Sequence, residues 1–131
     1  MNSPQNSPIF VVVDDENDIT DLIQSGIETF ELGDSKTFNN PLQALAFIQE
    51  NTQQDIIMIT DICMPEMNGI ELIKNSLIFH DRIKFIVVSG LINTKAEEVL
   101  KNESIPFFKK PITLKSLYQT AQALKDDFLV S

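Results

Sequence analysis

The chain has 131 residues, which predicts one domain that can bury a core without help from a disulfide or a structural metal. Its formal net charge of −9 argues against direct binding of nucleic acid or anionic membrane surfaces, because both are negatively charged. The single cysteine, Cys63, excludes an intrachain disulfide and a cysteine metal cluster.

The N-terminus is polar, and it lacks the basic start and apolar run of a signal peptide. We expect residues 1–8 to form a flexible tail ahead of a folded domain over residues 9–129. No apolar stretch approaches the ~20 residues that a membrane helix requires. The sequence therefore predicts a cytoplasmic protein with no membrane insertion.

Short apolar runs without alternation predict strands that are buried on both faces. Such runs cover Ile9–Val13, Ile56–Thr60 and Phe85–Val88, and weaker strand candidates cover Ser35–Phe38 and Ile105–Phe108.

Apolar residues at spacings of three and four predict helices between these strands. Asn40 followed by Pro41 is typical of a helix start, and Gly33 is placed to end the preceding helix. The expected apolar faces are Ile19, Leu22, Ile23, Ile27 and Phe30; Leu42, Leu45, Ala46 and Ile48; Ile70, Ile73, Leu77 and Ile78; the Thr94–Asn102 segment; and the Leu114–Phe128 segment.

Strand and helix thus alternate about five times, which predicts an α/β fold with a parallel sheet covered by helices on both faces. In such sheets ligands bind beyond the carboxyl ends of the strands. Five polar residues follow four of the predicted strands directly, and we expect them to share that edge: Asp14, Asp15, Asp61, Ser89 and Lys110.

Three carboxylates in one pocket repel each other, by about 4 kcal/mol for a pair ~4 Å apart near a protein surface. A hard divalent cation such as Mg²⁺ is the natural partner for such oxygen ligands. Lys110 would add a positive charge to this edge, and Ser89 would add a hydroxyl donor. The combination predicts a site for a transferring phosphoryl group, with a carboxylate as the nucleophile.

These residues also carry a family resemblance that spans roughly Ile9 to Phe128. They are Asp14-Asp15, the segment Asp61-Ile62-Cys63-Met64-Pro65-Glu66-Met67-Asn68-Gly69, Val88-Ser89-Gly90 and Lys110-Pro111. The chain resembles the receiver domain of two-component response regulators, and it is close in size to the single-domain chemotaxis regulators. The resemblance implies a doubly wound, flavodoxin-like sheet of five strands in the order 2-1-3-4-5, with about five helices on both faces.

The resemblance also implies roles for single residues. Asp61 would be the phosphoacceptor, supplied by a histidine kinase or a histidine phosphotransfer protein. Asp14, Asp15, Asp61 and the backbone carbonyl of Cys63 would hold Mg²⁺ or Mn²⁺. Ser89 and Lys110 would contact the phosphoryl group, Gly90 would leave room for it, and the Lys110-Pro111 bond would be cis. Such a domain is a signalling switch rather than a metabolic enzyme.

Phosphorylation would be relayed through the switch residues Ser89 and Phe107. The surface formed by the Thr94–Asn102 helix, the last strand and the Leu114–Phe128 helix would then bind a downstream target of unknown identity. Phenylalanine cannot donate a hydrogen bond, so switching at Phe107 would depend on packing alone. The resemblance leaves dimerisation on phosphorylation open.

Two further positions bear on the lifetime of the signal. Cys63 and Leu91 lie two residues after Asp61 and Ser89, where the family uses side chains that orient the hydrolytic water. Neither side chain can orient water well, so we expect slow self-dephosphorylation.

Two alternatives use the same strand-end carboxylate differently. A haloacid-dehalogenase-type phosphohydrolase would need an acid two residues after the nucleophile, where this chain has Cys63. A flavodoxin-like module could instead bind a protein partner without phosphorylation. The sequence leaves open whether the chain is a stand-alone regulator or a piece of a larger one, although Met1 favours a natural N-terminus.

Overall fold

The computed structural model describes residues 7–130, and within them five strands form one parallel sheet. The strand order is β2-β1-β3-β4-β5, and every neighbouring pair is parallel. The strands are β1 (Ile9–Val13), β2 (Ser35–Phe38), β3 (Ile56–Thr60), β4 (Ile83–Ser89) and β5 (Phe107–Lys109). This arrangement confirms the predicted fold class and strand order.

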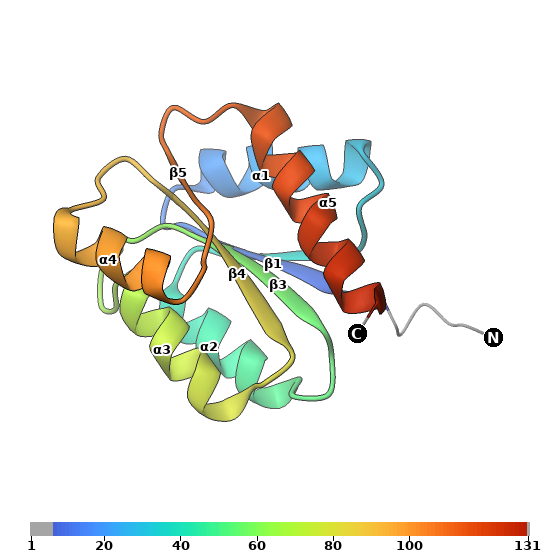
Figure 1. Ribbon diagram of the computed structural model, residues 1–131, viewed down its shortest axis with the longest axis horizontal. Helices are drawn as coiled ribbons and strands as arrows, with labels where there is room; N and C mark the ends of the chain where they lie inside the picture. Colours follow the sequence, from blue (N-terminus) through green and yellow to red (C-terminus); the bar gives the residue numbers. More distant parts are fainter. Residues whose placement is uncertain (1–6, 131) are drawn as a thin grey trace.

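Five helices alternate with the strands and cover both faces of the sheet (Figure 1). They are α1 (Asn17–Thr29), α2 (Pro41–Glu50), α3 (Gly69–Phe79), α4 (Thr94–Asn102) and α5 (Leu114–Val130). Helices α1 and α5 lie on one face, and α2, α3 and α4 lie on the other. The molecule therefore has three layers with two hydrophobic cores.

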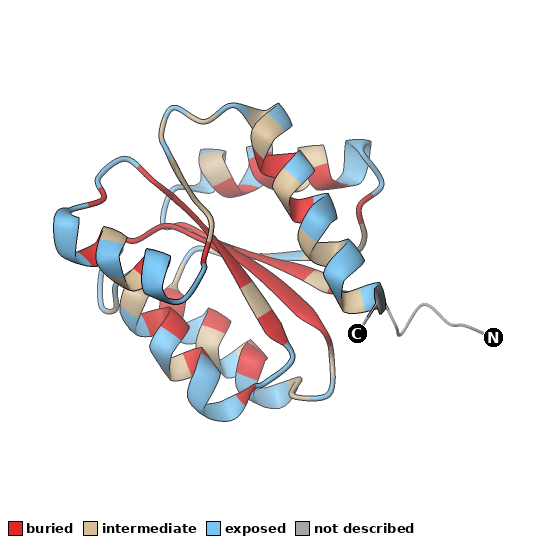
Figure 2. Ribbon diagram, viewed as in Figure 1, coloured by how far each residue is buried: buried red, intermediate tan, exposed pale blue. Residues whose placement is uncertain are grey.

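Neighbouring residues of each central strand point into different cores. Val11 and Met58 pack in the core beneath α2, α3 and α4, whereas Val12 and Ile59 pack in the core beneath α1 and α5. This alternation follows from the two-residue repeat of a strand. It explains why the central strands have continuous apolar runs, and Figure 2 shows them buried while the helices expose their outer faces.

Two strand predictions differ from the structure. Strand β4 begins at Ile83, two residues before the predicted start, and ends at Ser89. Strand β5 is Phe107–Lys109 rather than Ile105–Phe108. Ile105 is not in the strand because its amide donates to the carbonyl of Leu100, which closes the end of α4.

The predicted helix faces were too wide. Leu22, Phe30, Leu42, Leu77 and Ile78 are all substantially exposed. The cores are instead filled from these helices by smaller or neighbouring residues, including Ala44 and Leu72. Helix α1 also ends at Thr29, four residues before the glycine that was expected to end it.

The start of α2 was predicted correctly, because the Asn40 side chain accepts hydrogen bonds from the amides of Leu42 and Gln43. The predicted tail falls on residues 1–8, of which residues 1–6 lie outside the described residues. In the described part, Pro8 is buried and the carbonyl of Ser7 accepts a hydrogen bond from Gln54. None of the helices within residues 7–130 is long and apolar enough to cross a membrane.

Candidate functional site at the carboxyl edge of the sheet

Backbone hydrogen bonds that extend the strand ladders bring three predicted site residues to one edge of the sheet. The amide of Asp14 donates to Phe38 O at 3.1 Å, and the amide of Asp61 donates to Val13 O at 3.1 Å. On the other side, the amide of Lys110 donates to Ser89 O at 2.9 Å. The parallel strands therefore fix these side chains relative to one another, although they lie far apart in the sequence.

The Lys110 ammonium lies between two buried carboxylates. Its Nζ is 2.9 Å from Asp14 Oδ2 and 3.1 Å from Asp61 Oδ2, and Glu16 Oε1 lies 3.6 Å away. Asp14 is 2% exposed and Asp61 is 6% exposed. Burial acts to lower the pKa of Lys110, but hydrogen bonds to Asp14 and Asp61 outweigh burial and raise that pKa above the ordinary lysine value.

The two oxygens of the Asp61 carboxylate have different partners. Oδ1 accepts hydrogen bonds from the amide of Ile62 at 2.6 Å and from the amide of Cys63 at 3.3 Å. Oδ2 faces Lys110. The amides hold the carboxylate in one orientation, so that Oδ2 is presented to the positive charge.

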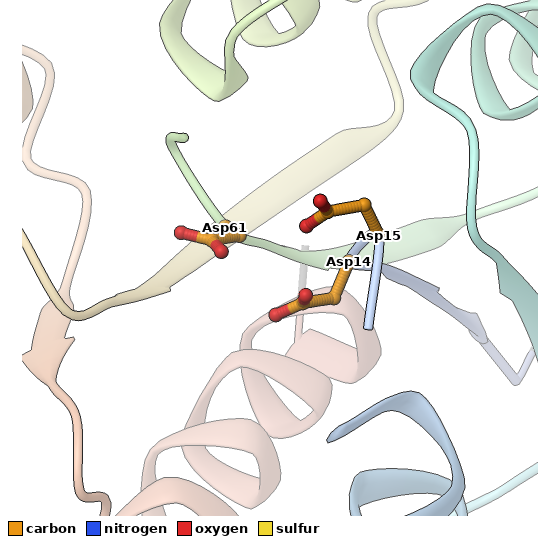
Figure 3. A group of neighbouring side chains, drawn as sticks. All are labelled: Asp14, Asp15 and Asp61. Carbon is orange, nitrogen blue, oxygen red and sulfur yellow. The ribbon is translucent and has the colours of Figure 1, made fainter. Parts of the chain in front are cut away.

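Asp14, Asp15 and Asp61 form an acidic cluster (Figure 3). One oxygen of each carboxylate lies within 4.8 Å of the others, and Asp15 is exposed to solvent. Burial raises the pKa of Asp14, and repulsion from Asp61 adds to this effect against the hydrogen bonds from Glu16 and Lys110. Three carboxylates and one ammonium have a net charge of −2 when all are ionised, so the donor set fits one hard divalent cation.

Gly69 allows α3 to start directly beside Asp61. A Cβ at this position would collide with the backbone carbonyl of Asp61. The amide of Gly69 donates to Ile62 O at 2.8 Å, which closes the loop between β3 and α3. Asn68 and Glu71 then complete a reciprocal cap at the start of α3. Only glycine fits this position without moving the loop that contains Cys63.

Ser89 lies at the same edge, but its hydroxyl is engaged with its own loop. The Ser89 Oγ donates to Leu91 O at 3.3 Å and accepts from the amide of Leu91 at 3.4 Å. Both bonds are long, so the hydroxyl can exchange them for a better acceptor at small cost. Leu91 itself is 69% exposed.

Phe107 is half-buried and packs against the core that includes Ala96 and Leu100 of α4. The Lys110-Pro111 bond is cis, which confirms that expectation.

The structure thus brings Asp14, Asp15, Asp61 and Lys110 together. Three residues that contribute to the site were absent from the prediction, namely Glu16, Asn40 and Glu66. Glu16 reaches Lys110, and Asn40 bonds the side chain of Glu66 in the loop after Asp61. Of these three residues, Glu16 alone had a signal in the sequence, because it directly follows the acidic pair Asp14-Asp15.

The protein is therefore a doubly wound α/β domain, and three aspartates that could hold a metal ion lie beside a lysine at the carboxyl edge of its sheet. Residues 10–122 match the family model of the response regulator receiver domain, and the chain belongs to this family. Receiver domains are modules of two-component signalling rather than conventional enzymes. They generally bind Mg²⁺ and interact with histidine kinases or downstream targets.

Relatives contain the same domain in different contexts. The chain is 32% identical over 126 residues to the transcriptional regulatory protein FlgR of Helicobacter pylori, covering 89% of the chain and 30% of that protein. It is 32% identical over 84 residues to the sensor kinase CckA of Brucella abortus, covering 63% of the chain and 9% of that protein. The chain therefore spans less than a third of either relative.

The fold is also found in solved structures. A CheY-like receiver domain protein from Methanospirillum hungatei superposes with a TM-score of 0.83 at 23% identity, covering 93% of this chain and 96% of that chain.

The raised pKa of Asp14 predicts how the Asp14→Asn variant responds to pH in the absence of metal. A carboxyl group whose folded pKa lies above its unfolded value of 3.8 adds stability below pH 3.8, and this stability is lost as the pH rises through the folded pKa. As the pH rises from about 4 to 7, the variant should therefore gain free energy of unfolding relative to the wild type.

Urea unfolding in chelator at several pH values measures this difference. Asp21→Asn removes an exposed carboxylate of α1 outside the cluster, and it should change stability by less than about 0.5 kcal/mol at either pH. An Asp14→Asn variant that is less stable than the wild type at pH 7, by an amount independent of pH, would contradict the assignment.

Proposed function

We propose that Asp61 accepts a phosphoryl group from a histidine kinase or a histidine phosphotransfer protein and thereby switches the domain between two signalling states. The observation that carries this proposal is the environment of Asp61. Its carboxylate is buried, oriented through Oδ1 by two backbone amides, and presented through Oδ2 to Lys110. A nucleophile of this kind needs orientation and nearby positive charge more than it needs a base.

In the proposed transfer, Asp61 Oδ2 forms a bond to phosphorus while the bond between phosphorus and the donor imidazole nitrogen breaks. The bonding electron pair leaves with that nitrogen, and the ring, protonated on its other nitrogen, departs as neutral imidazole. Lys110 Nζ lies 3.1 Å from Oδ2, so its ammonium can stabilise the negative charge on the phosphoryl oxygens during the transfer.

Asp14, Asp15, Asp61 and the backbone carbonyl of Cys63 would hold Mg²⁺ or Mn²⁺. When bound, the cation would offset the charge of the carboxylates and of the phosphoryl oxygens. The net charge of the cluster supports this assignment, because Lys110 alone leaves two negative charges uncompensated.

Ser89 and Phe107 are proposed to pass the signal to the surface formed by α4, β5 and α5. The long hydrogen bonds of the Ser89 hydroxyl favour a move towards a phosphoryl oxygen, which would draw Leu91 and the start of α4 with it. Phe107 packs against the core beside α4, so a shift of this loop would change its packing. This surface is the proposed binding site for a downstream protein.

We further propose that residues 9–129 form the receiver module and that this module acts in the cytoplasm. The names of its relatives support this context, because one is a sensor kinase and another is a transcriptional regulator. Since the chain spans only part of each, its own output partner is not specified by them.

Incubation with acetyl phosphate and Mg²⁺ should add one phosphoryl group to the wild type and none to Asp61→Asn. Intact-mass spectrometry measures the adduct, and a chelator should abolish it. Lys110→Met should also lower the labelling rate, because it removes the positive charge that faces Oδ2.

The control for labelling is Asp126→Asn, which changes an exposed carboxylate of α5 and should be labelled like the wild type. Equal labelling of Asp61→Asn and wild type would contradict the assignment of the acceptor. If the wild type stays unlabelled with acetyl phosphate and also with a phosphohistidine donor, the proposed function is wrong.

The phosphorylated protein should lose its phosphoryl group slowly in Mg²⁺, with a half-life of minutes or longer. Cys63 and Leu91 are both exposed at the proposed site, and neither side chain can position an attacking water by a strong hydrogen bond. Cys63→Asn should shorten the half-life severalfold. Intact mass followed over time measures the decay, and a wild-type half-life of seconds would rule out a long-lived signal.

A further inference from the structure

The loop after Asp61 contains a strained turn. Glu66 has a φ of 74°, a region that residues with a side chain rarely adopt. The amide of Met67 donates to Pro65 O at 2.8 Å, two residues back, which makes Glu66 the centre of a γ-turn. A γ-turn with positive φ at its centre is the rarer and more strained of the two forms. Such a turn persists only where surrounding contacts hold it.

The contact that holds Glu66 comes from the start of α2. Asn40 Nδ2 donates to Glu66 Oε1 at 2.6 Å, while Oδ1 of the same side chain accepts from the amides of Leu42 and Gln43. The backbone amides of Leu42 and Gln43 require an acceptor, so Oδ1 of Asn40 faces them and Nδ2 faces the Glu66 carboxylate. Serine or aspartate could cap α2 equally well. Asparagine alone among the common caps has an acceptor and a two-proton donor on one short side chain.

Asn39, the residue before Asn40, contacts the loop after β1, which contains Asp14 and Asp15. Asn39 Nδ2 donates to the backbone carbonyl of Asp14 at 2.9 Å and to the hydroxyl of Thr20 at 3.2 Å. The two consecutive asparagines therefore connect one turn to both loops that supply the acidic cluster. Asn39 bonds the loop that contains Asp14, and Asn40 bonds the loop that follows Asp61.

We propose that Asn40 is a positioning residue for the cation: through Glu66 it holds the loop from Ile62 to Asn68 in the conformation that the acidic cluster needs. This inference rests on the proposed metal-dependent function, and it adds a residue outside the carboxylates themselves. Asn40 touches neither the cation ligands nor the phosphoryl group in this role. Without its bond, the turn at Glu66 would relax, and the Cys63 carbonyl would be held less firmly in a loop that the bonds from Cys63 N to Asp61 and from Gly69 N to Ile62 still close.

The variant that tests this role is Asn40→Ser, which keeps a helix cap and loses the donor that reaches Glu66. Glu66→Ala removes the acceptor instead, and Glu66→Gln keeps an acceptor oxygen without the charge. Asn51→Ser is the matched control, because Asn51 bonds the carbonyl of Phe47 at the opposite end of α2. The probe is MgCl₂ alone, and the readout is the rise in melting temperature with Mg²⁺ concentration.

Asn40→Ser and Glu66→Ala should each raise the Mg²⁺ dissociation constant, fitted from the rise in melting temperature, by about tenfold, the low end for groups that orient metal ligands indirectly. Glu66→Gln and Asn51→Ser should match the wild type. The double variant Asn40→Ser/Glu66→Ala should be no worse than either single variant, because both remove the same bond. The metal-free melting temperature of Asn40→Ser should stay near that of the wild type.

A wild-type Mg²⁺ dissociation constant in Asn40→Ser would overturn the inference, and so would effects of the two single variants that multiply in the double variant. Labelling with acetyl phosphate separates this inference from the proposed function. The Mg²⁺ midpoint for labelling should shift as the dissociation constant from melting does, with little change in labelling rate at saturating Mg²⁺. A wild type that binds Mg²⁺ but accepts no phosphoryl group would refute only the proposed function. A wild type that binds no Mg²⁺ would refute both.

Discussion

The ammonium of Lys110 between the carboxylates of Asp14 and Asp61 is the interaction on which the site depends. Two buried carboxylates this close would repel, and the lysine offsets part of that repulsion through two short ion pairs. The offset is incomplete, since burial and Asp61 still raise the pKa of Asp14. The domain thus keeps an excess of negative charge at one edge of its sheet. This excess makes the edge suited to a divalent cation and, in the proposed function, to a phosphoryl group.

The parallel sheet holds these like charges close together. Each site residue follows a strand whose other residues are buried in two cores, so the strand ends cannot move independently. The ladder bonds at Asp14, Asp61 and Lys110 continue the sheet up to the site itself. The loops beyond the strands are held differently, by local backbone bonds such as that of Gly69 to Ile62 and by side-chain contacts such as those of Asn39 and Asn40. Rigid strands position the charges, whereas the loops supply the parts that are proposed to move.

The strand-end residues could be predicted from the sequence because a buried strand and the polar residue after it are adjacent in the chain. Asp14, Asp61 and Lys110 needed only the rule that parallel strands end at one edge. The bond between Asn40 and Glu66 could not be predicted, because its partners are far apart in the sequence and each has a sufficient local explanation. The apolar periodicity also failed at Leu22 and Ile78. These helices contain more large apolar residues than the cores admit, and periodicity alone does not rank them.

The assignment of Asp61 as the acceptor is tested most directly by locating the phosphoryl group chemically. Borohydride converts an acyl phosphate of aspartate to homoserine, so reduction of the phosphorylated protein followed by peptide mass mapping identifies the acceptor. We predict homoserine at position 61 alone, because the Asp61 carboxylate is turned towards Lys110 and held by two backbone amides, whereas Asp14 accepts the amide of Glu16. Homoserine at position 14 or 15, or at none of the three aspartates, would contradict it.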